Sequence, residues 1–358
     1  MAEPVGTVNS QPEPASHRLD DYSFEFPEDL VAVAPAGERD ASRLLVVERR
    51  FDRIHHRRFS EIGHFLRPGD CLVINRSKVF PARLTGQKTT GGKVELLMVA
   101  EETPQLWRAL SSDLKLGATV HLENAIEARV EGLNDDGEWL LRFSTPDVER
   151  LMEESGRAPL PPYILKKRKS GRMPMDAPGD LFRYQTVYAK ERGSIAAPTA
   201  GLHFTEELLA QLRRLGIRVA EILLHVGVGT FRPVSVSDVR EHRMPAERYE
   251  IPQAAAETIS ETRLRGGRIV AVGTTSVRTL ETWWPDTKIK SGETSIFIRP
   301  GHEFRCVDAL LTNFHQPRST PLLLASAFAG RERLLAAYRE AVEKKYRLFS
   351  YGDSMLIL

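Results

Sequence analysis

The sequence contains little cysteine and no long hydrophobic run. Its 358 residues include two cysteines, Cys71 and Cys306, each within an apolar stretch, which favours buried free thiols over a disulfide. No apolar run approaches the roughly 18 residues that span a membrane, and the N-terminal segment lacks the basic and apolar blocks of a secretion signal. These absences predict a soluble cytoplasmic protein.

The sequence also lacks an excess of charge of one sign and the common nucleotide-binding motifs. The formal net charge is only +2, so a basic coat for nucleic acid is absent, although a local basic patch remains possible. There is no G-x-G-x-x-G fingerprint, P-loop, G-x-S-x-G elbow or H-E-x-x-H motif. With 41% hydrophobic and 27% charged residues, the composition is that of a globular protein, long enough for two domains.

The chain divides by pattern into four parts. Residues 1–17 are rich in Pro, Ser, Gln and Glu and predict a disordered tail. Residues 79–154 hold short runs of β-forming residues separated by turns, without helices, which predicts a small antiparallel β-barrel. Residues 18–78 and 155–358 predict one α/β domain with a mixed sheet, discontinuous in sequence, with the barrel inserted into it.

Glycine, threonine and histidine gather in loops next to the predicted strands of the α/β domain. Open α/β sheets bind ligands beyond the carboxyl ends of their strands, so these loops predict a binding site. His203 arrives just before a helix start at Thr205, and the segment 273–276 (Gly-Thr-Thr-Ser) opens another helix. His225 and His315 each follow a strand. Histidine titrates near neutral pH, which suits acid and base catalysis.

Other interpretations of these features remain open at this stage. A single histidine is more often a hydrogen-bonded structural residue, and three histidines could hold zinc, although none has the spacing of a zinc motif. The basic run 166–169, followed by Arg172, could contact a nucleic-acid backbone or form a solvated flexible loop.

Several long motifs, in one order, resemble a known family from residue 22 to residue 358. They include Pro159-Leu-Pro-Pro-Tyr163, Tyr184-Gln-Thr-Val-Tyr188, Ala196-Ala-Pro-Thr-Ala-Gly-Leu-His-Phe204, Leu224-His-Val-Gly-Val-Gly-Thr-Phe231, Ala271-Val-Gly-Thr-Thr-Ser-Val-Arg278, Thr312-Asn-Phe-His315 and Phe349-Ser-Tyr-Gly-Asp353. On these motifs the chain resembles the S-adenosylmethionine:tRNA ribosyltransferase-isomerases of queuosine biosynthesis. That family likewise has an α/β domain interrupted by a small β-barrel.

The resemblance implies a reaction and its partners. The ribosyl group of S-adenosylmethionine would be transferred to preQ1 at the wobble position of tRNA and rearranged, giving epoxyqueuosine with release of adenine and methionine. S-adenosylmethionine would be consumed as a co-substrate, and neither a cofactor nor a metal is expected. The expected partners are S-adenosylmethionine and tRNA with a G-U-N anticodon. The protein is expected to be a monomer and not to bind a membrane.

The chemistry can be assigned to residues as a hypothesis. A proton must leave the carbon beside the sulfonium and adenine must be protonated, so His203, His225 and His315 are the candidate bases and acids. Thr274, Thr275, Ser276 and Arg278 would receive the methionine carboxylate, and Asp353 and Tyr351 would face the sulfonium or the ribose hydroxyls. The remaining candidate substrate-binding residues are Thr199, Gly201, Gly227, Gly229, Thr230 and Asn313.

Three positions depart from what the family often carries: Pro245 replaces a histidine, Arg192 a proline and Arg318 an acidic residue. These changes leave open a divergent paralogue that uses S-adenosylmethionine with a different acceptor. A non-catalytic RNA-binding protein that has kept the fold is a further alternative, against which the intact histidine and Gly-Thr motifs argue.

Overall fold

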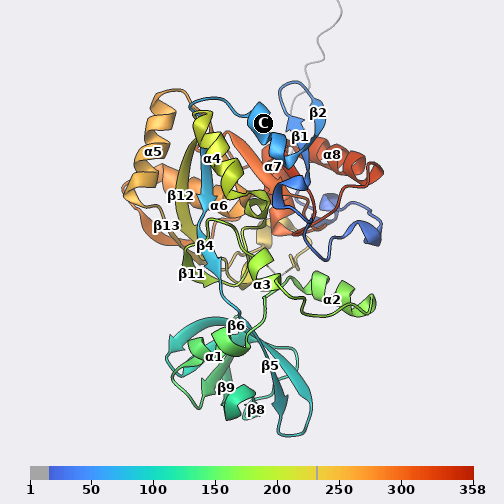
Figure 1. Ribbon diagram of the computed structural model, residues 1–358, viewed down its shortest axis with the longest axis vertical. Coiled ribbons are helices and arrows are strands. Elements are labelled where there is room, and N and C mark those ends of the chain that lie inside the picture. The colour runs from blue at the N-terminus through green and yellow to red at the C-terminus, as the bar shows by residue number, and fades with distance from the viewer. Residues whose placement is uncertain (1–15, 231–232) are drawn as a thin grey trace, which may run out of the picture.

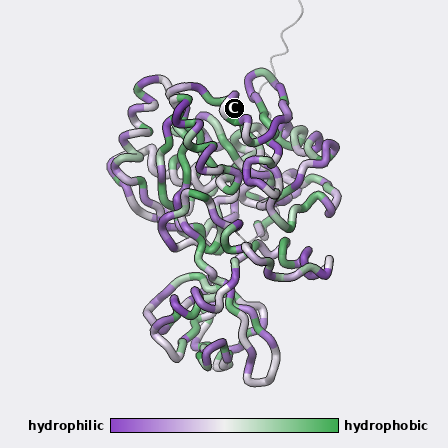
Figure 2. The backbone as a smooth tube through the Cα atoms, viewed as in Figure 1, coloured by the Kyte–Doolittle hydropathy of each residue, from purple (hydrophilic) through white to green (hydrophobic). Residues whose placement is uncertain are grey.

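The structure is a computed structural model that describes residues 16–230 and 233–358. It has two bodies, a large α/β domain and a small β-barrel joined by a narrow neck (Figure 1). Hydrophobic segments lie inside both bodies, whereas hydrophilic segments follow the outer helices and loops (Figure 2). Each body therefore has its own core. The fold class expected from the sequence is confirmed.

A nine-stranded mixed sheet, in the order β15-β13-β12-β3-β14-β16-β17-β1-β2, forms the centre of the large domain. Its strands β12, β3, β14 and β16 are parallel, and antiparallel strands flank them. The bounds are β1 Arg43–Glu48, β2 Arg53–Arg58, β3 Cys71–Asn75, β12 Arg218–Leu224, β13 Glu247–Glu250, β14 Ile269–Val272, β15 Ser291–Thr294, β16 Ala309–Asn313 and β17 Ser354–Ile357. Two short strands, β4 Ser77–Val79 and β11 Glu191–Ser194, pair in parallel beside it.

Strands β3 and β14 are buried along their whole length, as expected for parallel strands covered on both faces. Alternate residues of β3 belong to different apolar clusters, Cys71 and Val73 to one and Leu72 and Ile74 to the other. Five α-helices contribute to these layers: α4 Glu206–Arg214, α5 Gln253–Leu264, α6 Gly273–Trp283, α7 Thr320–Ala329 and α8 Arg331–Glu343. The Thr205 hydroxyl caps α4 as the sequence predicts, accepting from the Leu208 N–H.

Short 3-10 helices connect these elements. They are η1 Leu19–Tyr22, η2 Glu28–Leu30, η3 Arg39–Ala41, η4 Phe59–Phe65, η5 Glu123–Ala125, η6 Thr199–His203, η7 Val228–Thr230, η8 Val239–Glu241 and η9 Trp284–Asp286. The predicted tail falls outside the described residues up to 15, whereas the His17 carbonyl accepts from the Val239 N–H. Cys71 and Cys306 are buried free thiols. Within the described ranges, no helix is long and apolar enough to cross a membrane.

The small domain is a closed barrel in the strand order β10-β7-β6-β5-β8-β9. Its strands are β5 Arg83–Lys88, β6 Lys93–Thr103, β7 Leu106–Leu110, β8 Thr119–His121, β9 Glu127–Leu133 and β10 Trp139–Phe143. Helix α1, Val148–Ser155, packs Leu151 and Met152 onto the barrel core. The barrel strands lie within the predicted insertion, while its limits at residues 79 and 154 stay predictions.

The basic run 166–169 is part of a helix, so the alternative of a loop is wrong, while Lys166 and Lys169 are exposed to solvent. Helix α2 spans Pro162–Ser170 and α3 spans Asp180–Arg183. Ile164 and Arg168, four residues apart, are both buried on one face of α2. An ion pair from Arg168 to the buried Asp180 accounts for this, because it lets a cation of the run lie inside the protein.

Candidate active site

A cleft in the large domain lies where β12, β14 and β16 end. Residues that follow these strands line it, including Val226, Gly273, Thr274, Thr275 and His315. The segment 196–200 and the start of α2, with Pro161, Pro162 and Tyr163, supply two further walls. The cleft therefore occupies the place where an open α/β sheet binds ligands.

The first turn of α6 borders the cleft because this helix begins at Gly273, within the segment that the sequence predicts to open it. Gly273 has φ of 85°, a conformation that side chains disfavour, and it turns the chain from β14 into the helix. The hydroxyl of Thr275 is buried without a hydrogen-bond partner among the described residues. Ser276 is different, since its hydroxyl donates to the Val272 carbonyl at 2.8 Å. Thr274 and Thr275 both line the cleft, and the buried Thr275 hydroxyl has no bond within the described residues that a ligand would have to replace.

A chain of hydrogen bonds leads from the cleft to the buried His203. The Thr199 hydroxyl lies 2.8 Å from Asn313 Oδ1, and the Asn313 amide donates to His203 Nε2 at 3.2 Å. His203 Nδ1 lies 2.8 Å from the Ser42 hydroxyl. Because the amide nitrogen can only donate, Nε2 accepts and Nδ1 carries the proton. His203 borders a second, smaller pocket with Arg39, Arg183 and Tyr351 rather than the cleft.

Burial lowers the pKa of His203 to about 4, which makes stability depend on pH. In the unfolded chain a histidine has a pKa of about 6.5, so below that pH the unfolded state takes up a proton that the folded state resists. We expect the free energy of unfolding to fall as the pH drops from about 6.5 towards 4, with no contribution from His203 above pH 7. Urea unfolding at several pH values measures this. His203→Gln should show a shallower fall, and parallel profiles for the two proteins would contradict the assignment.

His315 lies in the cleft itself. Its Nε2 is 2.7 Å from the Thr312 hydroxyl, and its backbone N–H donates to the Tyr338 hydroxyl at 2.8 Å. Burial lowers the pKa of His315 to about 3, so the imidazole is neutral near pH 7. Within the described residues, no side chain is hydrogen-bonded to Nδ1, which leaves one ring nitrogen free for a substrate.

The structure does not bring the other two candidate catalytic residues into the cleft. His225 lies against Gly193 of β11, where a side chain would collide with its ring, and burial lowers the pKa of His225. Asp353 is buried, and its carboxylate accepts the Arg43 N–H at 2.9 Å and the Arg347 N–H at 2.8 Å. Neither His225 nor Asp353 is among the residues that line the two pockets. Asp353 is held by backbone N–H groups, whereas His225 Nδ1 is buried without a hydrogen-bond partner among the described residues, and catalytic roles for both stay predictions.

The candidate glycines act mainly through close packing. A side chain at Gly201 would collide with the Tyr188 hydroxyl, and one at Gly229 would meet Pro245. The Gly227 N–H donates to Glu247 Oε1 at 2.8 Å. The Tyr351 hydroxyl is buried in the small pocket without a partner among the described residues, and the side chain of Thr230 falls outside them. These residues shape the loops around the cleft.

Glu247, on β13, is a functional candidate that the sequence did not indicate. It forms an ion pair with Arg278, and both side chains are buried. Arg278 also donates from Nε to the Ile296 carbonyl at 3.2 Å. Arg278 lines the cleft, but its charge is balanced by Glu247. The only sequence signal was alternation: Glu247 and Tyr249 point inward from β13, as an apolar pair would.

The three departures from the family pattern have local partners. Arg192 forms ion pairs with Glu153 at 3.0 Å and with Glu149 at 3.7 Å. Arg318 lines the cleft and pairs with Asp20 at 3.6 Å, while Pro245 packs on Gly229. Among the described residues, no group of three His, Cys, Asp or Glu side chains could hold a metal ion.

The fold and the cleft are those of an α/β protein with an inserted barrel and a cleft at the strand ends, where such sheets bind ligands. A family model described as queuosine biosynthesis protein matches residues 19–357, and the chain belongs to this family. It is 48% identical over 346 residues to the S-adenosylmethionine:tRNA ribosyltransferase-isomerase of Thermotoga maritima, covering 95% of this chain and 100% of that protein. The enzyme of that name from Anaeromyxobacter sp. (strain K) is 51% identical over 351 residues, covering 95% and 99%.

A solved structure shares the fold. The crystal structure of S-adenosylmethionine tRNA ribosyltransferase from Thermotoga maritima superposes with a TM-score of 0.54 and 38% identity. The match covers 94% of this chain and 100% of that one. The family resemblance read from the motifs is therefore confirmed.

Proposed function

We propose that this protein transfers the ribosyl group of S-adenosylmethionine to preQ1 at the wobble position of tRNA and isomerises it to give epoxyqueuosine. The observation that carries the proposal is the near-complete match, at about half identity, to enzymes named for this reaction. The cleft at the strand ends is where such a substrate would bind. The co-substrate would be consumed, with no metal or other cofactor, by a monomer acting in the cytoplasm on tRNAs with G-U-N anticodons.

The chemical balance of the reaction sets what the cleft must do. The preQ1 amine forms a bond to the ribosyl group, which rearranges to the epoxycyclopentane, while the carbon-sulfur bond breaks to release methionine and the glycosidic bond breaks to release adenine. A proton leaves the carbon beside the sulfonium and the bonding amine loses a second one; one of these two protons reaches adenine and the other passes to solvent. We assign the first transfer to His315, because it is the histidine of the three that lines the cleft and its Nδ1 is free.

His203 has a different role in this proposal. Its ring holds the Asn313 amide, and Asn313 in turn holds the Thr199 hydroxyl at the cleft wall. Thr199 and Asn313 are then fixed as partners for the ribose hydroxyls. His203 is accordingly a positioning residue, which acts on the substrate through Asn313.

Thr275 and Thr274 are the proposed receptors of the methionine carboxylate. They lie in the first turn of α6, where the backbone N–H groups and the helix dipole favour an anion. Arg278 is a weaker candidate than the sequence suggested, since Glu247 already balances its charge.

Replacing Thr275 with valine tests this assignment, because valine keeps the shape and removes the hydroxyl. A hydrogen bond to a charged group contributes about 1.5–3 kcal/mol, so we expect KM for S-adenosylmethionine to rise about 10- to 100-fold. Steady-state kinetics of adenine release measure this, and kcat should stay within about threefold. Thr279→Val is the matched control, since that hydroxyl bonds within the same helix to the Thr275 carbonyl. Equal KM values for all three proteins would contradict the assignment.

The experiment that tests the proposed function compares two RNA substrates. The protein and S-adenosylmethionine are incubated with tRNA that carries preQ1 or with the same tRNA carrying guanine, and adenine release is followed. Release with preQ1-tRNA alone is the expected result. Release with neither RNA would overturn the proposal, and release that needs no preQ1 would favour a different acceptor.

A further inference from the structure

Helix α2 and its flanking turns carry a strongly unbalanced charge. Residues 156–175 contain six basic and no acidic residues: Arg157, Lys166, Lys167, Arg168, Lys169 and Arg172. Helix α2 projects from the large domain beside the neck that leads to the barrel (Figure 1). This positive charge is concentrated at one place, although the net charge of the whole chain is only +2.

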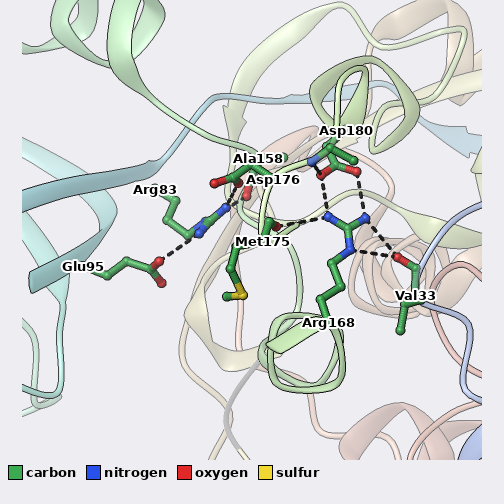
Figure 3. Close-up of polar contacts among 9 residues, drawn as sticks. Val33, Arg83, Glu95, Ala158, Arg168, Met175, Asp176 and Asp180 are labelled. Carbon is green, nitrogen blue, oxygen red and sulfur yellow. Dashed lines mark hydrogen bonds and ion pairs between the residues drawn. The ribbon is translucent and has the colours of Figure 1, made fainter. Parts of the chain in front are cut away.

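Two of these cations serve the protein itself. Lys167 donates to the carbonyls of Glu28 and Val31, the second at 2.8 Å. Arg168 is 2% exposed and binds both carboxylate oxygens of Asp180, at 2.6 and 2.9 Å. It also donates to the carbonyls of Val33 and Met175 (Figure 3). These bonds fix α2 on the large domain.

A second arginine ties the same segment to the barrel. Arg83, at the start of β5, is buried and pairs with Glu95 of the barrel at 2.8 Å and with Asp176 of the turn after α2 (Figure 3). Its Nε donates to the Ala158 carbonyl at 3.2 Å. The α2 segment is thus attached to both domains, so its surface is held in place and is not a flexible loop.

The other cations of the segment face solvent. Lys166, Lys169, Arg172 and Arg157 are exposed, and none of the four forms an ion pair within the described residues. Lys166 and Lys169 are three residues apart, so they lie on one face of α2, opposite the buried Ile164 and Arg168. Exposed cations that the protein does not neutralise are suited to bind phosphates.

This basic face begins at the wall of the cleft. Pro162 and Tyr163, the first residues of α2, line the cleft, and the Tyr163 hydroxyl accepts the Ser350 N–H at 2.8 Å. Along the helix axis, Lys166 and Lys169 follow Tyr163 by roughly 5 and 9 Å. A polyanion bound on α2 would therefore lead directly into the cleft.

An exposed aromatic residue lies on α3, the short helix whose Asp180 pairs with Arg168 of α2. Phe182 of α3 is 73% exposed, and the Arg39 guanidinium lies 5.6 Å from its ring centre. Neighbouring Leu181 is 43% exposed. Burying such a ring is favourable, so its exposure points to a partner that stacks on it. Unpaired RNA bases stack on aromatic rings next to cations, which duplex nucleic acid cannot do without unpairing.

Exposed arginines elsewhere have another explanation. Strand β2 is the edge of the large sheet and carries Arg53 and Arg57, near the opposite end of the large domain (Figure 1). Charged side chains on an edge strand prevent pairing with other chains. Helix α2 has no edge to protect, so its free cations need a ligand.

From these observations we propose that the exposed face of α2 and Phe182 form a docking surface for a single-stranded RNA loop and its flanking backbone. Lys166, Lys169 and Arg172 hold the phosphates, and Phe182 stacks on an unpaired base. The surface delivers the adjoining nucleotide into the cleft. This inference rests on the proposed function, since it names the surface on which the RNA substrate would lie.

The test is binding of a fluorescent RNA stem-loop, and of a paired RNA duplex of equal length, in the absence of S-adenosylmethionine. The variant Lys166→Ala/Lys169→Ala/Arg172→Ala should bind the stem-loop about tenfold or more weakly at low salt. The slope of log affinity against log salt should fall by about 2. The control Arg50→Ala/Arg53→Ala/Arg57→Ala removes equal charge from the β1–β2 hairpin and should stay within about twofold of wild type.

Phe182→Ala tests the stacking separately. A stacked base contributes enough that we expect stem-loop affinity to fall about 5- to 100-fold, with duplex affinity unchanged. Leu264→Ala is the control, because Leu264 is exposed on α5, away from the cleft. Equal losses for the α2 variant and the hairpin control, or stem-loop affinity unchanged in the α2 and Phe182 variants, would overturn the docking surface.

Adenine release separates this inference from the proposed function. With saturating preQ1-tRNA the α2 variant should keep kcat and the KM for S-adenosylmethionine, while its KM for RNA rises. If the wild-type protein releases adenine but the α2 variant binds RNA as tightly as wild type, the docking surface is rejected and the proposed function stands. If stem-loop binding depends on α2 but the wild-type protein releases no adenine, the docking surface is supported and the proposed function is rejected.

Discussion

Replacing His315 with alanine is expected to lower kcat for adenine release by about 10²- to 10⁴-fold, the contribution of a positioned acid or base. His315 lines the cleft, its Nε2 is held by the Thr312 hydroxyl, and its Nδ1 is free. Burial lowers its pKa to about 3, so the ring is neutral near pH 7, the form that a base needs, while the same burial weakens it as a base. Single-turnover assays of adenine release measure the effect without interference from product release.

The loss should belong to the chemical step and not to folding. His64→Ala is the matched control, since His64 is exposed on η4, and its activity should equal that of wild type. The melting temperature of His315→Ala should show that it remains folded. A folded His315→Ala enzyme with a rate within about threefold of wild type would remove His315 from the catalytic step.

Replacing Arg168 with alanine is expected to destabilise the protein by about 3–5 kcal/mol. The substitution leaves the Asp180 carboxylate buried without its cation, and the carbonyls of Val33 and Met175 lose their donors. The urea midpoint and the melting temperature report the change, and we expect the latter to fall by about 5–10 °C.

Two further variants separate the buried charge from general effects of the substitution. Lys169→Ala removes an exposed neighbouring cation and should change stability by less than about 0.5 kcal/mol. Arg168→Met combined with Asp180→Leu removes both charges and should recover part of the loss, because the carbonyls of Val33 and Met175 and the Ala177 N–H still lack their partners. Equal stability of Arg168→Ala and wild type would show that the ion pair does not hold α2 in place.

The sequence predicts where the cleft lies better than it predicts which residues line it. Glycine and threonine after buried strands indicate strand ends, and the parallel core of the sheet brings β12, β14 and β16 to one edge. Residues 273–275 and His315 therefore meet in the cleft, as expected. This step succeeds because strand direction follows from the alternation of helices and strands along the chain.

The separation of the histidines could not be predicted. His203, His225 and His315 occupy similar loops in the sequence, yet each ring points into a different environment. Which way a ring points depends on partners far along the chain, such as Ser42 for His203. Arg168 and Asp180 form a second case, since their pairing buries a cation that sequence pattern alone assigns to solvent.

The central claim is that the ribosyl carbons of S-adenosylmethionine end on the tRNA base. It is tested most directly by supplying S-adenosylmethionine with heavy carbon throughout the ribose and measuring the mass of the nucleosides from preQ1-tRNA. The account predicts epoxyqueuosine that carries the whole labelled group, with adenine released in equal amount. Unlabelled preQ1 nucleoside beside intact labelled S-adenosylmethionine would contradict it.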